Sequence, residues 1–232
     1  MRNELLWALM LIVNFLSIIF IYKKFGKIGL YSWIPVSTIL ANIQVVLLVR
    51  LFGFSTTLGN ILYAGGFLVT DILAENYGKK SAQKAVQIGF FSLIVTSIIM
   101  KIAVLFVPLE EGIVMFESVK QIFDFMPRLM IASLLAYFIS QSHDIWAYEF
   151  WKKKYSSTKH IWIRNNASTL VSQFIDNLVF TIVAFYGVYP FEVLKEIFIA
   201  TYVIKFIVAI SDTPFVYIAH YLKRNNLVEE EI

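Results

Sequence analysis

Two short strings in the sequence repeat a pattern of side chains that could bind a polar ligand. Both read Ser-Gln-x-x-Asp, at Ser140 to Asp144 and at Ser172 to Asp176. Residues three apart share one face of a helix, so each string places an amide and a carboxylate side by side. Carboxylates accept hydrogen bonds from N–H groups, and amides both accept and donate them. The pattern therefore favours recognition of a ligand with several polar atoms.

Further polar residues interrupt stretches that are otherwise apolar. Such groups are costly inside a membrane, so they normally face the interior of a helix bundle, where they pair or line a pathway. A single amide can instead hold two helices together. For Asn42 or Asn60 this structural interpretation is at least as strong as a ligand contact. The candidate substrate-binding residues are Asn42, Gln44, Asn60, Asp71, Glu75, Arg128, Gln141, Asp144, Gln173, Asp176, Asn177 and Lys205.

The charged candidates also have structural interpretations. Unpaired carboxylates at membrane depth cost more than packing usually returns, so we interpret Asp144 and Asp176 as ligand contacts. Lys205 could instead neutralise one of them in a buried ion pair with little net stabilisation. Asp71 and Glu75 lie near the inner end of an apolar run, where a solvated or capping role is an equal alternative.

Several neighbouring residues receive weaker interpretations. Asp212 precedes Thr213-Pro214, where a kink could expose backbone carbonyls to a cavity. Lys101 lies near the end of its apolar run and is expected to reach the headgroups. His143 lies next to Asp144 in the first string and is therefore expected to point elsewhere. The aromatic candidates for stacking on a flat ligand are Phe174, Phe180 and Tyr202.

The elements that must position these residues are membrane-spanning helices. Of the 232 residues, 59% are hydrophobic and only 16% are charged, whereas soluble domains average about 25% charged residues. Seven apolar runs approach the roughly 20 residues that a helix needs to cross a bilayer. We therefore predict an all-α, polytopic transmembrane helix bundle. The predicted spans are residues 5–22, 28–49, 57–73, 86–107, 129–150, 168–188 and 197–221.

Positive charge alternates between the connections of these spans. Thirteen Lys and Arg residues lie in the connections on one side, such as Lys23, Lys24 and Lys27, against five on the other. Cytoplasmic loops are enriched in Lys and Arg, so the N-terminus is predicted outside and the C-terminus in the cytoplasm. Residues 108–127 are predicted to form an outer loop with an interfacial helix. The predicted parts are an N-terminal span (1–27), a six-helix domain (28–224) and an acidic cytoplasmic tail (225–232).

Missing residues and motifs exclude several functional classes. Cysteine is absent, which excludes disulfides, thiolate metal sites and cysteine nucleophiles. The sequence contains no P-loop, no H-E-x-x-H and no G-x-S-x-G, and its three histidines lack metal-ligand spacing. An Arg ladder and a TVGYG filter are also missing, which disfavours a channel. We expect no catalytic residue, no metal site and no cofactor.

Several strings carry a family resemblance. They are Ala41–Val45, Thr57–Tyr63 and Thr70–Lys80, and the string T-D-x-x-x-E-x-Y-G-K-K within the last is the most specific. The similarity continues through Arg128, both Ser-Gln-x-x-Asp strings, Tyr202 to Lys205 and Thr213-Pro214, and covers about residues 36 to 222. Together they resemble the queuosine precursor transporter family, also called the vitamin uptake transporter family.

This resemblance implies a bacterial inner-membrane importer of 7-deazaguanine bases, the precursors of the tRNA nucleoside queuosine. Such bases include 7-cyano- and 7-aminomethyl-7-deazaguanine and queuine. The resemblance also implies a six-helix core similar to the substrate-binding S components of energy-coupling factor transporters. The first span lies outside the resemblance, which leaves its role open.

A 7-deazaguanine base suits the polar residues of the sequence. One carboxylate can accept the N–H donors at N1 and the 2-amino group together, while an amide or a lysine can bind the carbonyl oxygen. We predict Asp176 or Asp144 at the donor edge and Lys205 in charge balance. The predicted contacts to the remaining polar atoms are Gln141, Gln173 and Asn42.

The resulting prediction is a transporter that works by alternating access and catalyses no covalent reaction. Its predicted partners are a nucleobase-like small molecule and membrane lipids, and not nucleic acid. One alternative is an S-type subunit that depends on a separate ATPase module. Another is an intramembrane enzyme that uses Asp144 and Asp176 as a carboxylate pair sharing protons. The preferred base, the energy source and the oligomeric state, a homodimer included, stay open.

Overall fold

The computed structural model describes residues 2–154 and 161–229. Within these ranges it does not describe the side chains of residues 141, 144, 145, 148, 149, 151–154, 161–170 and 208–210. The chain divides into two compact units. The first unit is Met1–Met126 with Val203–Ile232, and the second unit is Pro127–Tyr202.

The chain opens with α1 (Arg2–Gln44), a helical element that reverses direction at Gly26. Gly26 has φ 52° and ψ −136°, a conformation that glycine adopts without the steric cost of a Cβ atom. Gln44 Nε2 lies 4.0 Å from Met10 Sδ, and the side chain of Asn3 donates to the carbonyl oxygen of Arg50. The second half of α1 therefore runs back along the first half. The reversal lies between the first two predicted spans.

A β-hairpin follows α1, at a place where the apolar pattern predicts helix. β1 (Leu48–Leu51) pairs antiparallel with β2 (Phe54–Thr57), and Phe52 and Gly53 at the turn both have positive φ. The second predicted span thus ends at Gln44 rather than at residue 49, and the third starts at Gly59. The error arises because a short run rich in valine and leucine satisfies both a strand and a span.

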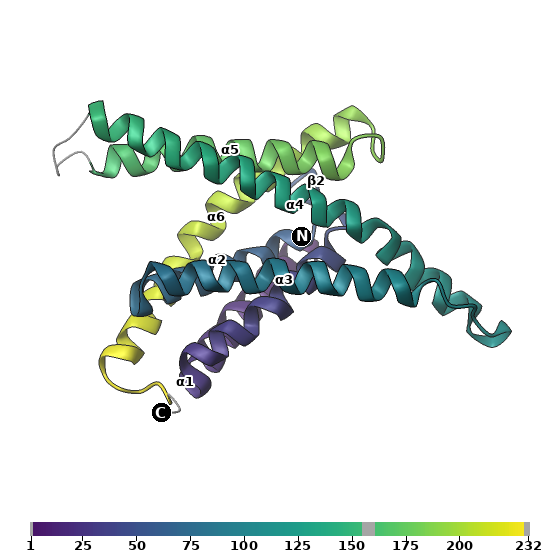
Figure 1. The fold of residues 1–232 in the computed structure, drawn as a ribbon, viewed down its shortest axis with the longest axis horizontal. Helices are drawn as coiled ribbons and strands as arrows, with labels where there is room; N and C mark the ends of the chain where they lie inside the picture. The colour runs from purple at the N-terminus through teal and green to yellow at the C-terminus, as the bar shows by residue number, and fades with distance from the viewer. Residues whose placement is uncertain (1, 155–160, 230–232) are drawn as a thin grey trace. The chain divides into compact units, whose positions relative to one another are not determined.

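The remaining elements are helical (Figure 1). α2 (Gly59–Tyr77) and α3 (Lys79–Ala103) are separated by Gly78, whose φ is 83°. η1 (Glu110–Gly112) and α4 (Ile113–Lys154) occupy most of the stretch predicted as an outer loop, and α4 continues through Pro127. That stretch contains many good helix formers, such as Glu, Lys, Gln and Met, so its helix is longer than the one expected within an outer loop. The last helices are α5 (Ile161–Phe185) and α6 (Phe191–Arg224).

Membrane-spanning capacity is evident in several of these helices. Among the described residues, three helical segments are long and apolar enough to cross a bilayer: Arg2–Gln44, Lys79–Ala103 and Glu110–Ser140. Val171–Phe185 is a shorter apolar helix. The predicted class, a helical membrane bundle, is confirmed, and the count of seven spans stays a prediction.

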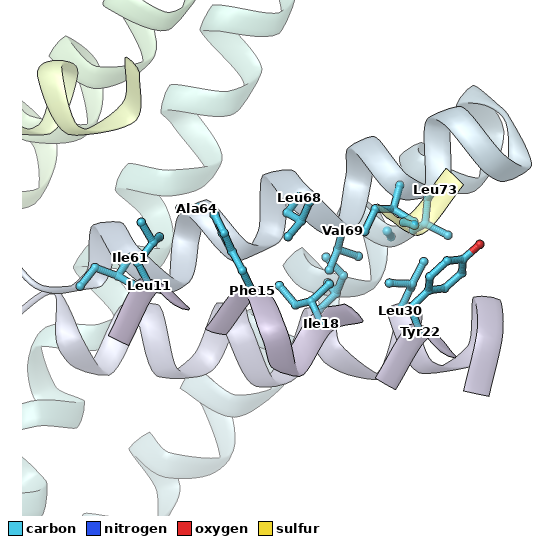
Figure 2. Packing of buried hydrophobic residues seen from close by; sticks show 14 of the residues in the cluster. Leu11, Phe15, Ile18, Tyr22, Leu30, Ile61, Ala64, Leu68, Val69 and Leu73 are labelled. Atoms are coloured by element: carbon cyan, nitrogen blue, oxygen red, sulfur yellow. The ribbon is translucent and has the colours of Figure 1, made fainter. Parts of the chain in front are cut away.

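The core of the first unit is the contact between α1 and α2. In Figure 2, Leu11, Phe15, Ile18 and Tyr22 of α1 face apolar side chains of α2. Gly65 permits this close approach, because a Cβ atom there would lie 2.5 Å from Asn14 Nδ2. Asn14 is buried, and its Nδ2 donates to the carbonyl oxygen of Ile61 at 3.0 Å. Small residues allow such close helix packing in membranes. The α2 residues labelled in Figure 2 are Ile61, Ala64, Leu68, Val69 and Leu73.

Three connections of the first unit lie together at one end. The Tyr31 hydroxyl donates to the carbonyl oxygen of Ser81 at 3.3 Å, which joins the segment after Gly26 to the start of α3. Lys24 Nζ lies 2.7 Å from Glu229 Oε1, which brings the segment after α6 to the same reversal. These are three of the connections that the sequence predicts to face the cytoplasm.

Candidate functional site

Polar residues of α2 and α6 meet along one contact of the first unit. Lys205 Nζ lies 5.5 Å from the ring centroid of Tyr63. Asp71 lies close enough to Asp212 for their negative charges to repel each other when both carboxylates are ionised. Tyr63 precedes Asp71 on α2 as Lys205 precedes Asp212 on α6, so the two helices run parallel here. We call these four residues the α2–α6 seam.

Asp212 is the most constrained member of the α2–α6 seam. It retains 5% of its accessible surface and is the one charged residue among the described side chains that is buried. Lys205 lies two helical turns earlier, so both residues project from the same face of α6. A buried carboxylate is costly unless a counter-charge or hydrogen-bond donors compensate it. A ligand with N–H donors would supply that compensation.

Asp212 is absent from the residues that the sequence selects as substrate contacts. The signal was present, because an ionisable residue in an apolar run is itself a candidate. The kink expected at Pro214 favours instead an interpretation based on backbone carbonyls. Pro214 lies inside α6, which continues to Arg224.

The amide candidates of the first unit have contacts close by. Asn42 Nδ2 donates to the carbonyl oxygen of Thr38 in its own helix at 2.9 Å. Asn60 Nδ2 donates to the carbonyl oxygen of Thr57 at 3.2 Å, at the start of α2. Gln44 Oε1 is buried and has no hydrogen-bond partner among the described residues. Local bonds therefore account for Asn42 and Asn60, which favours their structural interpretation.

Glu75 lies near the end of α2, where the three connections meet. Its Oε1 is 3.7 Å from Nδ1 of His220, and that nitrogen is also 3.3 Å from Oδ1 of Asn76. Glu75 and His220 are both exposed. These contacts fit the alternative of a solvated residue at the inner interface.

In the second unit, α4 and α5 bring the two Ser-Gln-x-x-Asp strings together. Ser140 Oγ lies 3.4 Å from Asp176 Oδ1, and His143 Nδ1 lies 3.0 Å from Ser172 Oγ. The later residue of α4, His143, contacts the earlier residue of α5, Ser172, so these two helices are antiparallel. His143 contacts α5 and does not point away, because it lies on the face that Ser140 also occupies. The side chains of Gln141 and Asp144 lie outside the described residues.

The other α5 candidates differ in their burial. Gln173 and Asp176 are half-buried. Asn177 is fully buried, and its Nδ2 donates to the carbonyl oxygen of Phe198 on α6 at 2.8 Å. This bond between two helices favours a structural role for Asn177. The ring of Phe174 packs edge-on against Phe198 and Tyr202, whereas Phe180 packs against Phe185.

Arg128 holds the end of α5. Its Nε donates to the carbonyl oxygen of Val183 at 2.8 Å, and its Nη2 donates to that of Tyr186. The last carbonyl groups of a helix lack partners within the helix, so a cation is well placed there. The contacts of Arg128 indicate a structural role.

Two further features lie away from the candidate residues. Lys101 forms an ion pair with Asp124, and both side chains are exposed. A surface hollow along the first part of α1 is lined mainly by Leu16, Phe20 and Phe25, an apolar set suited to lipid. Among the side chains that the structure describes, no cluster of His, Asp and Glu fits a metal ion.

Comparison with known proteins decides the family of the chain. The family described as "Putative vitamin uptake transporter" matches residues 57–219. A Bacillus subtilis (strain 168) protein named "Probable queuosine precursor transporter" is 42% identical over 219 residues, which cover 94% of this chain and 95% of that protein. The chain belongs to the vitamin uptake transporter family.

More distant relatives of this family carry similar names. A Haemophilus influenzae protein named "Probable queuosine precursor transporter" is 29% identical over 135 residues, which cover 58% of this chain and 54% of that protein. The Escherichia coli (strain K12) "Queuosine precursor transporter" is 23% identical over 192 residues, 82% of each chain. No solved structure matches. The likeness of the core to S components therefore stays a prediction.

Family membership makes this chain a multi-pass membrane protein. The family match begins in β2 and ends within α6, so it contains the α2–α6 seam and the paired α4 and α5 strings. The alignment with the B. subtilis relative leaves out too few residues to omit the first span. That relative therefore shares at least part of the span that lies outside the family match.

Proposed function

We propose that this vitamin uptake transporter imports queuosine precursors, which are 7-deazaguanine bases, by alternating access and without covalent chemistry. The observation that carries the proposal is the 42% identity to the B. subtilis protein named "Probable queuosine precursor transporter" over 94% of the chain. The buried carboxylate of Asp212 in an apolar bundle supports it, since importers of polar solutes need such groups at depth.

The α2–α6 seam is the proposed substrate contact of the first unit. The carboxylates of Asp71 and Asp212 repel each other, so binding N–H donors between them lowers the energy of both. The N1 and 2-amino groups of a 7-deazaguanine supply such donors. Lys205 is suited to the carbonyl oxygen of the base, with its stem beside the Tyr63 ring. Asp212 thereby joins Asp71 and Lys205 in the proposed site.

The second unit supplies further proposed contacts. Gln173 and Asp176 are half-buried and carry the amide and carboxylate types that the base requires. Gln141 and Asp144 stay proposed contacts on the basis of their sequence pattern. Phe174 and Tyr202 present aromatic rings for stacking on a planar ligand.

We also propose the bacterial inner membrane as the location, with the N-terminus outside and the C-terminus in the cytoplasm. The meeting of the Gly26 reversal, the α2–α3 junction and the end of α6 supports this topology, because all three connections are rich in lysine. Positive charge on one side of a bundle is typical of its cytoplasmic face.

Uptake by a bacterial strain that neither synthesises nor imports 7-deazaguanines tests the proposal. The strain is supplied with 7-cyano- or 7-aminomethyl-7-deazaguanine at limiting concentration, and queuosine in tRNA is measured by mass spectrometry. Expression of this chain is expected to restore queuosine. Absence of queuosine with either base, despite normal abundance in the membrane, would contradict the proposal.

The same assay distinguishes the alternatives. Uptake that requires co-expression of an energy-coupling ATPase module would favour the S-type subunit. Purified protein in liposomes should accumulate the base unchanged, and a chemically altered base would favour an intramembrane enzyme instead.

A further inference from the structure

Three lysines from three helices surround two tyrosine rings in the first unit. Lys27 Nζ lies 5.7 Å from the ring centroid of Tyr31 and 5.3 Å from that of Tyr77. Lys84 Nζ lies 6.0 Å from the Tyr31 centroid. Lys223 Nζ lies 4.4 Å from the Tyr77 centroid. We call Lys27, Lys84 and Lys223 the lysine cluster.

Two carboxylates in the described part of the chain lie near the lysine cluster. The carboxylate of Glu75 lies 3.7 Å from Nδ1 of His220, and that of Glu229 forms an ion pair with Lys24. In the described part of the chain, neither Lys27 nor Lys84 forms an ion pair. Aromatic faces attract ammonium groups only weakly at exposed sites, whereas the ammonium groups repel one another. An anion would relieve this repulsion.

Each member of the lysine cluster lies at a helix end. Lys27 directly follows Gly26, and Lys223 lies in the last turn of α6. Lys84 lies in the second turn of α3, whose first turn has no side-chain cap. The partial positive charge of that helix start adds to the field of the lysines. In a membrane protein, helix ends that carry tyrosine and lysine belong at the level of the lipid headgroups.

We propose that the lysine cluster binds the phosphate of an anionic membrane lipid. The position at the helix ends places the ammonium groups where lipid phosphates are concentrated, and clustered lysines beside spanning helices attract such lipids. One phosphate held by Lys27, Lys84 and Lys223 would connect α1, α3 and α6. The lipid therefore acts as a cross-link at the end where the three connections meet.

Thermal unfolding of the purified full chain tests this binding. The chain in a neutral detergent is titrated with phosphatidylglycerol, with phosphatidylcholine, and with inorganic phosphate. Phosphatidylglycerol is expected to raise the unfolding midpoint by about 3 °C more than phosphatidylcholine, since a ligand stabilises the state that it binds. An equal shift with inorganic phosphate would overturn the proposal in favour of a free-phosphate site.

Charge-matched variants locate the effect. The triple variant Lys27→Gln, Lys84→Gln, Lys223→Gln should lose the shift that distinguishes phosphatidylglycerol. The control Arg50→Gln, Lys120→Gln, Lys195→Gln removes the same charge elsewhere and should keep it. A shift that persists in the first variant, or disappears in the second, would contradict the proposal.

A single substitution covers the case in which the triple variant does not fold. Lys84 is exposed, so Lys84→Gln should leave the midpoint without lipid unchanged. Native mass spectrometry should then show at least about threefold weaker retention of phosphatidylglycerol. Unchanged retention would argue against a site at this cluster.

Discussion

The two faces of α2 differ in what they place against their neighbours. Toward α1, the helix presents Ile61, Leu68 and Gly65 to an apolar, closely packed contact. Toward α6, it presents Tyr63 and Asp71 to the charged residues of the α2–α6 seam. The first face explains why the helix is held in place, and the second explains what it can bind. One helix thus joins the stabilising contact to the proposed transport site.

Substitution of Gly65 tests the packed face and should have the largest effect. In Gly65→Leu the new side chain would collide with Asn14, which is buried and bonded to α2. Overpacking of this kind costs about 1–3 kcal/mol, so we expect a large fall in the folded fraction. Fluorescence-detected gel filtration of detergent extracts measures it.

The neighbouring glycine provides the matched control for this substitution. A Cβ atom added at Gly66 would meet open space, with no atom of a neighbouring element within 4 Å, so Gly66→Leu should fold like the wild type. Equal behaviour of Gly65→Leu and Gly66→Leu would show that the α1–α2 contact is not as close as the structure indicates.

Neutralising Lys205 tests the charged face. Lys205→Gln leaves Asp71 and Asp212 with their mutual repulsion and without a cation on the same face. We expect uptake to fall about tenfold, equivalent to about 1.4 kcal/mol, at unchanged abundance. Lys101→Gln serves as control, since Lys101 lies in an exposed ion pair. Wild-type uptake by Lys205→Gln would remove Lys205 from the site.

In the second unit, Arg128 allows the same distinction between a residue that stabilises the fold and a residue that binds the substrate. Arg128→Lys keeps the charge but cannot reproduce both donations to α5. Loss of one charged hydrogen bond predicts a destabilisation of about 1.5 kcal/mol, visible as a lower unfolding midpoint. The affinity of the folded protein for the base should stay unchanged. A loss of affinity with unchanged stability would instead favour the ligand role that the sequence predicts.

Asn177 should show the smallest effect. Its bond to the carbonyl oxygen of Phe198 joins α5 to α6, and such bonds within membranes average about 0.6 kcal/mol. Asn177→Ala is therefore expected to lower the unfolding midpoint slightly and to leave uptake unchanged. Strongly reduced uptake by a stable Asn177→Ala protein would return Asn177 to the substrate site.

The fold class follows from the sequence because apolar length is a direct consequence of crossing a bilayer. The hairpin at Leu48–Thr57 does not follow, since its apolar residues suit strand and span equally. The antiparallel pairing of the Ser-Gln-x-x-Asp strings could be predicted from consecutive spans. The individual contacts could not be predicted. Whether Ser140 meets Asp176 and His143 meets Ser172 depends on how each helix is rotated about its own axis.

Burial is the property of the site that the sequence conveyed least. Asp71, Asp212 and Lys205 are all ionisable residues of apolar runs, and hydropathy does not rank them. The structure distinguishes Asp212, because only its side chain is removed from solvent. Asn42 and Asn60 carry the right chemical groups, but bonds to nearby backbone carbonyls engage them.

Direct binding of the base to Asp212→Asn protein tests the central claim that the charged face of α2 and α6 is the substrate contact. Titration calorimetry with 7-aminomethyl- and 7-cyano-7-deazaguanine compares wild type, Asp212→Asn and the exposed control Glu117→Gln. We predict at least about tenfold weaker binding by Asp212→Asn, with an unfolding midpoint no lower than that of the wild type, and wild-type affinity for Glu117→Gln. Equal affinity of all three proteins would contradict the account.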